Sequence, residues 1–415
     1  MQQSIYIQNE GYSNPKIVVS KSYKCYLEDI KGRKYIDTTI GNGTHILGHS
    51  SPIINNAITQ QIDNGLLFTT CNKVAYETAE LICNVYPTFG SVVFCNSGSE
   101  ATMRAARIAR AYTKRDKIAI FSGAWHGGNE LFMYDHDYAY DDHDTVHKSS
   151  GVPDCYKDTV IVLPYNDDEA FDIIEKNKND LAMIIIEPSQ GSNPRDDMGS
   201  YLTHLRGIAS RHGIVLCFDE IITGFRVGYG GCQEYYNIEA DIVTYGKTVG
   251  GGLPIGVVAG KKEIISVVGG HGEHLPVFMG GTFSANPLVM QVSKTLLTHL
   301  YSNKEKIYPY LNSMGGYLKS EINKYCLEAG IKAHMIGIGS MLRLVHTEHL
   351  VNSRKERDIF ENNTVKIDNF YNDLLINENI FVNNNRIIFL SLSHDEKIVK
   401  QMLSSIIKCL DRGEF

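Results

Sequence analysis

Residues 214–227 read IVLCFDEIITGFRV, an apolar run that ends abruptly in acidic residues. Ile214 to Phe218 are apolar without alternation, which is typical of a strand buried on both faces of a parallel sheet. The run ends in Asp219 and Glu220, and a carboxylate at the end of a buried strand is costly unless a cation or a hydrogen-bond donor faces it. Asp219 is therefore expected either to hold a ligand or to be a hydrogen-bonded aspartate with a structural role only.

Six further apolar runs have the same form, each ending in polar or glycine-rich residues. They occupy residues 92–95, 118–121, 160–163, 182–186, 242–243 and 255–259. Helix-length stretches such as 100–112 and 201–212 separate many of these runs, and strands that alternate with helices predict a mostly parallel sheet covered on both sides. We therefore expect an α/β protein with a large domain at residues 51–299.

The two ends of the chain differ from this pattern. After residue 300 the composition shifts toward Lys, Asn, Glu and Tyr. An amphipathic stretch and two apolar runs follow, at residues 311–326, 341–345 and 387–392. Near the other end, residues 26–37 read as a strand, a turn and a second strand. These segments predict a smaller α+β domain, built from residues 1–50 together with 300–415.

Composition limits the classes of function. The 415 residues carry 40 Lys and Arg against 47 Asp and Glu, and the net charge of −7 gives no support to binding of nucleic-acid phosphates. No stretch approaches the roughly 18 consecutive apolar residues of a membrane span. The nine cysteines include no CxxC pair, which argues against a disulfide scaffold or a zinc ribbon and fits a reducing compartment. We expect a cytoplasmic protein with no metal site and no membrane or nucleic-acid partner.

Small and polar residues follow the run at 92–95, in the order Asn96-Ser97-Gly98-Ser99-Glu100-Ala101. In an open parallel sheet the ligand lies at the carboxyl ends of the strands, so this turn is a candidate binding site. Ser97 and Ser99 can cap the following helix, and Gly98 lets a ligand approach the N–H groups at the positive end of the helix dipole. The turn is therefore either an anion site or an ordinary helix N-cap.

Two further strand ends carry residues suited to a flat ligand. Lys247 follows an apolar run and precedes Gly250-Gly251-Gly252, so it is placed like a Schiff-base lysine, the alternative being a solvated side chain. Trp125, the only tryptophan, stands with His126 in a glycine-rich turn after the run at 118–121. It is either a stacking platform or a core residue.

Together these strand ends offer an anion cup, a carboxylate, an amine and an aromatic face. Pyridoxal phosphate (PLP) needs all four, because its electron-sink role depends on a protonated ring nitrogen held by a carboxylate. A nicotinamide dehydrogenase, the other common use of such a sheet, is disfavoured because no GxGxxG motif follows an early strand. We therefore expect pyridoxal 5'-phosphate as the cofactor.

Six motifs follow one another between residues 46 and 287. They are NSGSEATMRAARIAR, WHG, EPSQG, FDEIITGFRV, YGKTVGGGLPIG and GTFSANP. With this set the sequence resembles the class III PLP-dependent aminotransferases, and within them the glutamate-1-semialdehyde 2,1-aminomutase group. The resemblance implies the fold of the fold type I PLP-dependent transferases.

The resemblance also implies roles for residues around the cofactor ring. Lys247 would bind the cofactor as a Schiff base and would move the substrate proton. Asp219 would keep the pyridine nitrogen protonated. Trp125 would stack on the ring where relatives usually have Tyr or Phe, with His126 beside it, and Ile222 would pack near the ring.

The phosphate contacts implied by the resemblance come from two subunits. Ser97, Gly98 and Ser99 would surround the phosphate of their own subunit. Thr282, in the GTFSANP motif, would reach the phosphate of a neighbouring subunit. We therefore expect a homodimer with shared active sites.

Three departures from the relatives bear on the substrate. Ser192 directly follows EPSQG, where enzymes that use glutamate and 2-oxoglutarate commonly have a glutamate, and this departure favours the aminomutase group, whose members lack that glutamate too. Residues 11–17 lack the arginine that binds the substrate carboxylate in the aminomutase group, and Asn42 lies near a position where that group has a tryptophan. We expect amino transfer between a small-molecule amine donor and an aldehyde, ketone or sugar-like acceptor. The alternatives are intramolecular transfer of the aminomutase type and a non-catalytic scaffold, and the retention of Lys247 with Asp219 argues against a scaffold.

Other polar clusters are weaker candidates for a site. Residues 135–148 combine histidines with aspartates, but their spacing matches no defined metal site, and an acidic loop over the active site is the preferred interpretation. Residues 271–274 are also expected to form a loop. Arg226 and Arg386 either hold a substrate carboxylate or phosphate or are structural.

Overall fold

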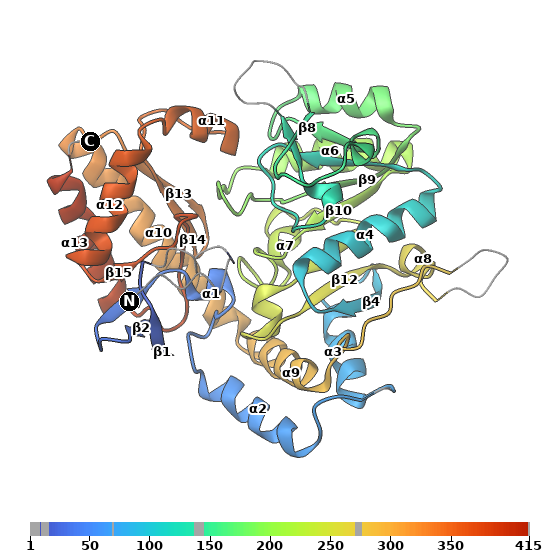
Figure 1. Ribbon diagram of the computed structural model, residues 1–415, viewed down its shortest axis with the longest axis horizontal. Helices are drawn as coiled ribbons and strands as arrows, with labels where there is room; N and C mark the ends of the chain where they lie inside the picture. Colours follow the sequence, from blue (N-terminus) through green and yellow to red (C-terminus); the bar gives the residue numbers. More distant parts are fainter. Residues whose placement is uncertain (1–8, 10–15, 69, 137–144, 270–275, 414–415) are drawn as a thin grey trace.

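A seven-stranded sheet organises the larger part of the chain (Figure 1). The computed structural model describes residues 9, 16–68, 70–136, 145–269 and 276–413. The sheet consists of β4 (Phe89–Cys95), β5 (Lys117–Phe121), β8 (Val160–Leu163), β9 (Leu181–Ile186), β10 (Val215–Asp219), β11 (Ile242–Tyr245) and β12 (Gly256–Lys261). Their order is β4-β12-β11-β10-β9-β5-β8, and only β12 is antiparallel to its neighbours. Each of the seven apolar runs between residues 92 and 259 contributes a strand to this mostly parallel sheet, so the predicted fold class is confirmed.

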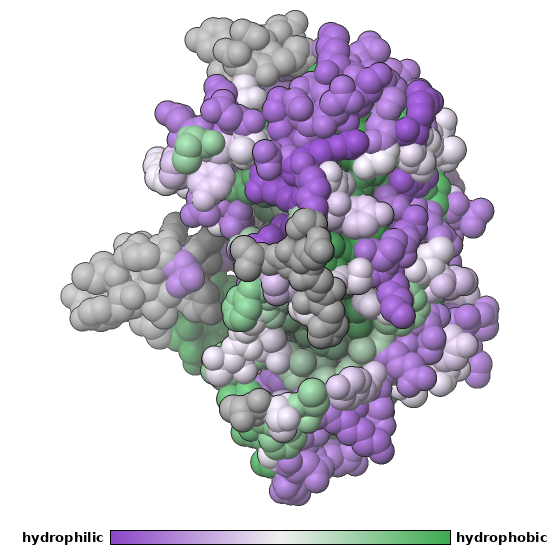
Figure 2. All heavy atoms as spheres, turned by 90° about the vertical axis from the view of Figure 1, so that its right-hand side faces the viewer, coloured by the Kyte–Doolittle hydropathy of each residue, from purple (hydrophilic) through white to green (hydrophobic). Residues whose placement is uncertain are grey.

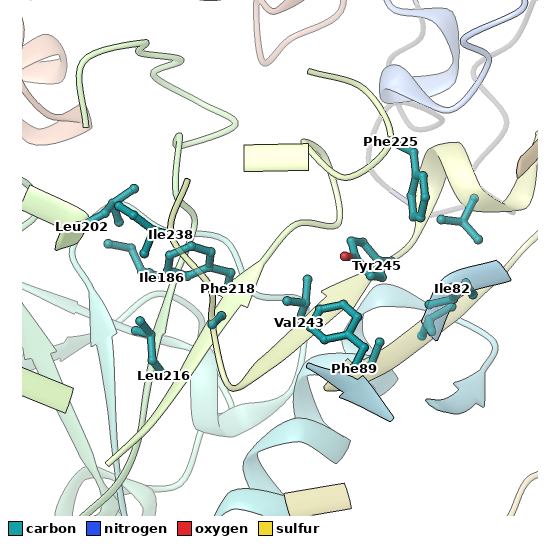
Figure 3. Close-up of a cluster of buried hydrophobic side chains, with 14 of the residues drawn as sticks. Ile82, Phe89, Ile186, Leu202, Leu216, Phe218, Phe225, Ile238, Val243 and Tyr245 are labelled. Carbon is teal, nitrogen blue, oxygen red and sulfur yellow. The ribbon is translucent and has the colours of Figure 1, made fainter. Parts of the chain in front are cut away.

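Apolar residues on both faces explain why these strands show no alternation. Leu216 and Phe218 of β10 pack in one core, and Val215 and Cys217 of the same strand pack in another on the opposite face. Figure 3 shows Leu216 and Phe218 beside Val243 and neighbouring side chains of the first core. A strand that has to fill two cores cannot place polar residues at every second position.

Helices cover both faces of the large sheet. The elements are α2 (Pro52–Asp63), α3 (Lys73–Cys83), α4 (Gly98–Thr113), α5 (Glu169–Asn177), α6 (Gly199–His212), α7 (Gly231–Tyr236), α8 (Lys262–Ile265) and α9 (Pro287–Ser302), with 3₁₀ turns η1 (Glu130–Phe132), η2 (Asp154–Thr159) and η3 (Lys247–Gly250). Buried residues of α4 and α8 share the core that contains Val215, whereas α5, α6 and α9 share the core that contains Leu216. The stretches predicted as helices at 100–112 and 201–212 correspond to α4 and α6.

Smaller sheets join the two ends of the chain. One contains β1 (Val19–Tyr23), β2 (Tyr26–Asp29), β3 (Lys34–Asp37) and β15 (Ile380–Phe381), and another contains β13 (His334–Ile338), β14 (Met341–Val345) and β16 (Ile388–Phe389). A two-stranded sheet pairs β6 (Tyr134–His136) with β7 (Thr145–His147). The predicted hairpin at 26–37 is the antiparallel pair β2 and β3. β3 also pairs in parallel with β15, where Ile36 lies opposite Ile380.

A separate apolar core supports these smaller sheets. The helices here are α1 (Ile40–Gly43), α10 (Lys304–Ala329), α11 (Arg354–Phe360), α12 (Thr364–Ile376) and α13 (Glu396–Arg412). α10 spans both parts of the molecule, because Ile307 and Leu311 belong to the core of the large sheet and Leu318 and Ile322 to the second core. The domain bounds 51–299 and 1–50 with 300–415 stay a prediction. Among the described residues, no helix has the length and hydropathy needed to cross a membrane.

Candidate active site

A cavity of about 510 Å³ lies at the carboxyl ends of the parallel strands. All the predicted site residues except Thr282 line it, namely Ser97, Gly98, Ser99, Trp125, His126, Asp219, Ile222 and Lys247. These residues follow or end β4, β5, β10 and β11, whose carboxyl ends meet at the same edge of the sheet. The topology thus brings together side chains that are far apart in the sequence.

The N-terminus of α4 forms one wall of the cavity. Ser97 Oγ accepts a hydrogen bond of 3.2 Å from Glu100 N, and the Glu100 carboxylate accepts one of 2.5 Å from Asn96 N, the residue before the N-cap. A Cβ atom at Gly98 would lie 2.5 Å from Ile221, so this position has no room for a side chain. The first N–H groups of a helix have no partner within the helix, and these remain suited to an anion. Ser97 is therefore the N-cap of α4, and the anion site stays a prediction.

The turn that carries Trp125 rests on the same helix terminus. Gly128 N donates a hydrogen bond of 3.1 Å to Ser99 Oγ. Gly127 has a φ of +93°, and a Cβ atom there would lie 2.3 Å from Ser99 Oγ. The Trp125 side chain is 59% exposed and lines the cavity, so it is not a core residue.

Asp219 is held by several donors. Its Oδ2 atom lies 2.7 Å from His126 Nδ1, and its Oδ1 atom accepts hydrogen bonds from Ile221 N at 3.1 Å and Thr244 Oγ1 at 3.2 Å. Asp219 is 4% exposed and His126 is 2% exposed. His126 Nε2 is buried and has no hydrogen-bond partner among the described residues. The carboxylate therefore has a fixed orientation at the floor of the cavity.

Lys247 stands at the end of β11 in an uncommon backbone conformation. Its φ is +42°, in the left-handed region that non-glycine residues rarely adopt. Gly252 has a φ of +111°, and a Cβ atom there would lie 2.6 Å from the His45 ring. Burial lowers the pKa of Lys247, and the nearby carboxylates of Asp219 and Glu187 oppose that shift. A lowered pKa increases the share of the neutral, nucleophilic amine.

Glu187 lines the same cavity and was not predicted as a site residue. It directly follows β9, is 6% exposed, and accepts hydrogen bonds from Trp125 N at 2.9 Å and Gly191 N at 2.7 Å. Burial raises the pKa of Glu187, and the two backbone donors and His126 oppose this. The rule that singled out Asp219, a carboxylate at the end of a buried strand, also applies to Glu187 after the run at 182–186.

The two candidate arginines are structural. Arg226 is fully buried and donates to Ser340 Oγ at 3.2 Å, to the Leu390 carbonyl at 3.1 Å and to the Gly43 carbonyl. Arg386 forms an ion pair of 2.7 Å with Asp368. Neither arginine lines the cavity.

The remaining candidates lie at the edge of the described structure or outside the cavity. Thr282 is exposed and does not line the cavity of its own chain. Most of the 135–148 segment, at 137–144, and residues 271–274 lie outside the described residues. No group of three or more His, Cys, Asp or Glu side chains in the described part of the chain is arranged to hold a metal ion.

The residues around the cavity fit pyridoxal phosphate. The N-terminus of α4 suits its phosphate, because the first N–H groups of a helix have no partner within the helix and the helix dipole favours an anion. Asp219 suits a protonated ring nitrogen, since its carboxylate is buried and fixed. Lys247 supplies the amine that an aldehyde requires.

Comparison with known proteins agrees with this geometry. The family profile described as aminotransferase class-III matches residues 7–364. A glutamate-1-semialdehyde 2,1-aminomutase of Alkaliphilus oremlandii is 34% identical over 417 aligned residues, which cover 96% of this chain and 91% of that protein. An omega-transaminase from Sphaerobacter thermophilus has a TM-score of 0.89 at 28% identity, with 96% of this chain and 92% of that chain covered. A structure described as a transaminase with PLP bound has a TM-score of 0.84 at 27% identity, with 95% and 91% covered.

The chain belongs to the class III aminotransferases. It is a PLP-dependent enzyme of the aminotransferase and aminomutase type, and the predicted family, fold and cofactor are confirmed.

Proposed function

We propose that the enzyme transfers an amino group from a small-molecule amine to an aldehyde, ketone or sugar-like carbonyl compound, with Lys247 as the Schiff-base lysine. One observation carries this proposal: Lys247 and Asp219 stand at the ends of the paired strands β11 and β10 and line one cavity with the N-terminus of α4. An amine, a carboxylate and an anion cup in one cavity are what PLP chemistry requires.

Bound PLP supplies an electron sink for the electron pair left when a proton is removed from the substrate. With PLP bound, Lys247 Nζ would be the base that takes up the substrate proton and gives it back. Asp219 holds a proton on the ring nitrogen, and its bonds to His126 and Thr244 keep the carboxylate in place. The N–H groups at the start of α4 hold the phosphate, with Ser97 and Ser99 beside them.

The lining of the cavity bears on the substrate class. None of the described residues that line it is an arginine. Ser192 stands at the position after EPSQG and carries no charge. A second carboxylate would find no arginine on the described lining, because the Arg357 guanidinium beside Ser192 donates to the Ser192 carbonyl and is paired with Asp358. These observations favour a substrate with at most one carboxylate.

Intramolecular amino transfer is the second candidate function, because the relative from Alkaliphilus oremlandii is described as a glutamate-1-semialdehyde 2,1-aminomutase. A single assay separates the two. The PLP-loaded enzyme is mixed with glutamate-1-semialdehyde, and 5-aminolevulinate is measured with no second substrate present. We expect slow or no conversion, and efficient conversion would replace our proposal with the aminomutase function.

A panel of single amine donors tests amino transfer itself. With a productive donor, the visible absorbance of lysine-bound PLP disappears and pyridoxamine phosphate accumulates. We expect this for at least one primary amine or amino acid with no second carboxylate. If no donor changes the absorbance and glutamate-1-semialdehyde is also inert, the protein is a non-catalytic scaffold.

The proposal includes a homodimer with shared active sites. Asn72 Nδ2 donates a hydrogen bond of 3.1 Å to the Ala285 carbonyl, which holds the described residues around Asn72 (66–68 and 70–76) beside the loop that carries Thr282. Several apolar side chains of these two segments are exposed, namely Leu66, Leu67, Phe68, Tyr76, Phe278 and Phe283. Figure 2 shows hydrophobic surface around the centre and lower part of one face, whereas hydrophilic side chains dominate its upper part. Exposed apolar patches of this kind mark protein interfaces.

Sedimentation analysis tests the dimer. We expect a mass of twice 46.4 kDa for the wild type and a shift toward monomer for Phe283→Asp. Because all nine cysteines are free thiols, we also propose that the enzyme works in the cytoplasm.

A further inference from the structure

The peptide bond between Ala124 and Trp125 is held on both edges by charged side chains. Glu187 Oε1 accepts a hydrogen bond of 2.9 Å from Trp125 N. Lys148 Nζ donates one of 2.7 Å to the Ala124 carbonyl. The N–H and the C=O of one peptide point in opposite directions, so the two side chains fix the plane of this peptide from opposite sides.

Both charged groups are taken out of water to make these contacts. Glu187 is 6% exposed, and the Lys148 side chain is 17% exposed. Besides Trp125 N, Glu187 accepts a hydrogen bond from Gly191 N, and Lys148 Nζ lies 3.7 Å from an Asp135 oxygen. Burying a charge is costly, and hydrogen bonds to charged groups are stronger than neutral ones. Two buried charged side chains thus hold a single peptide group, the one between Ala124 and Trp125.

The rest of this turn is held in the same manner. Gly123 N donates to both Asp135 oxygens at 3.1 Å, and the Gly123 carbonyl accepts a bond of 3.2 Å from Arg354. The His126 carbonyl accepts a bond of 2.6 Å from Thr102. With the backbone fixed on either side, the direction of the Cα–Cβ bond of Trp125 is fixed as well. The indole then has only its two side-chain torsions left to vary.

We propose that Glu187 and Lys148 are positioning residues that set the orientation of the Trp125 indole against the ring of the cofactor. This inference rests on the proposed PLP site, where Trp125 is the stacking residue. Neither residue exchanges a proton with the substrate. They act through the peptide plane, which decides whether the indole lies parallel to the cofactor ring when PLP is bound.

Trp125 is the only tryptophan of the chain, so fluorescence excited at the red edge of tryptophan absorption, where the 24 tyrosines absorb little, reports on this one side chain. The variants are Glu187→Gln, which removes the charge, and Lys148→Met, which removes the donor. Lys148→Arg keeps a cationic donor and serves as the conservative rescue. Lys117→Met is the matched control, because Lys117 forms a 3.4 Å ion pair with Asp180 at the opposite end of β5.

Anisotropy and acrylamide quenching of Trp125 are measured for each variant, before and after PLP is added. We expect Glu187→Gln and Lys148→Met to lower the anisotropy and to raise the quenching constant at least twofold, and to weaken the quenching of the indole by bound PLP. Lys148→Arg and Lys117→Met should match the wild type. In half-transamination, kcat should fall more than tenfold in the first two variants with KM changed less than threefold.

Wild-type anisotropy and quenching in folded Glu187→Gln and Lys148→Met would overturn the inference. Circular dichroism confirms folding, and if one variant does not fold, the other still decides. The fluorescence of the cofactor-free protein is independent of turnover, so the inference can fail or hold whether or not the enzyme transfers amino groups.

Discussion

The imidazole of His126 is hydrogen-bonded to the carboxylate of Asp219, with 2.7 Å between Nδ1 and Oδ2. The bond joins the turn after β5 to the end of β10 across the intervening strand β9. His126 directly follows Trp125 in the sequence. One hydrogen bond therefore links Asp219, the proposed partner of the ring nitrogen, to the turn that carries Trp125, the proposed stacking residue. The two halves of the cofactor environment are therefore not independent.

Replacing Asp219 tests its proposed role at the ring nitrogen. Asp219→Asn keeps the size of the side chain but removes its charge. We expect the rate of half-transamination to fall roughly 10²-fold or more, the usual range for loss of a proton-holding group. PLP content should stay close to that of the wild type. Stopped-flow absorbance measures the rate, and a rate within threefold of the wild type would refute this role.

His126 supports Asp219 and should matter less. His126→Phe keeps a ring that can pack against Phe132, the aromatic neighbour at 5.6 Å, but removes the hydrogen bond. A hydrogen bond to a charged group contributes about 1.5–3 kcal/mol, which is roughly a tenfold to hundredfold effect on the rate. The same absorbance assay checks this. A larger loss than that of Asp219→Asn would mean that His126 acts on the cofactor directly.

Removing the proposed Schiff-base lysine has a spectroscopic outcome. Lys247→Ala should lack the visible absorbance of lysine-bound PLP and should show no turnover. Lys262→Ala is the control, because Lys262 is an exposed lysine after β12. The visible absorbance spectrum of the dialysed protein shows whether PLP is bound to a lysine. A wild-type spectrum in Lys247→Ala would show that another lysine holds the cofactor.

Two neighbouring glycines of α10 should respond in opposite directions to the same substitution. A Cβ atom at Gly315 would lie 1.9 Å from the Gly339 carbonyl oxygen, whereas one at Gly316 meets nothing within 4 Å. Gly315→Ala should lower the free energy of unfolding by about 1–3 kcal/mol through overpacking. Gly316→Ala should raise it by about 0.5–1 kcal/mol through helix propensity. Denaturant unfolding measures both, and equal effects would contradict the close contact of α10 with Gly339.

Stability should fall in mild acid because of a buried neutral histidine. His394 Nδ1 accepts a hydrogen bond from Ser391 N, and Nε2 donates to the Asp37 carbonyl, so both nitrogens are satisfied in the neutral form. Burial lowers the pKa of His394 from 6.5 to about 4. Between pH 6.5 and about 4, His394 therefore binds a proton in the unfolded chain but not in the folded chain. The resulting stability is complete above about pH 6.5 and is lost as the pH falls toward 4.

A His394→Gln variant isolates this contribution. A shift of this size contributes at most about 3 kcal/mol. Tm measured from pH 7.5 to 4.5 should fall less steeply for the variant than for the wild type. Other buried histidines, such as His45 with a pKa lowered to about 4, leave some slope in both. Identical slopes would show that His394 is protonated as easily in the folded chain as in the unfolded one.

The large sheet could be predicted because its signal is local. A strand that fills a core on each face has to be apolar throughout, and every such run of the sequence became a strand. The run at 387–392 behaves differently, since only Ile388 and Phe389 pair with β14 as a strand. Leu390 N donates to the Ser340 carbonyl and Leu392 N to the Ile46 carbonyl. Successive residues thus bond to separate segments, which no local pattern reveals.

The residues of the site also divide into those with a local sequence signal and those without one. Asp219, Lys247 and Trp125 were predicted because they directly follow apolar runs. Glu187 has the same signal and was considered only as part of a motif. Lys148 carries no local signal at all, because its contact with the Ala124 carbonyl depends on how the segment after β7 folds back over the turn. A contact between side chain and distant backbone becomes visible only with the tertiary structure.

The pairing of Ile36 with Ile380 has a consequence for biosynthesis. β3 is synthesised long before its parallel neighbour β15, because the whole large sheet lies between them in the sequence. The strands of the large sheet, from β4 to β12, are complete well before that. Thr44, which lines the cavity, follows β3 closely in the sequence. A nascent chain can thus pair the strands that carry the floor of the cavity before the parallel partner of β3 has been synthesised.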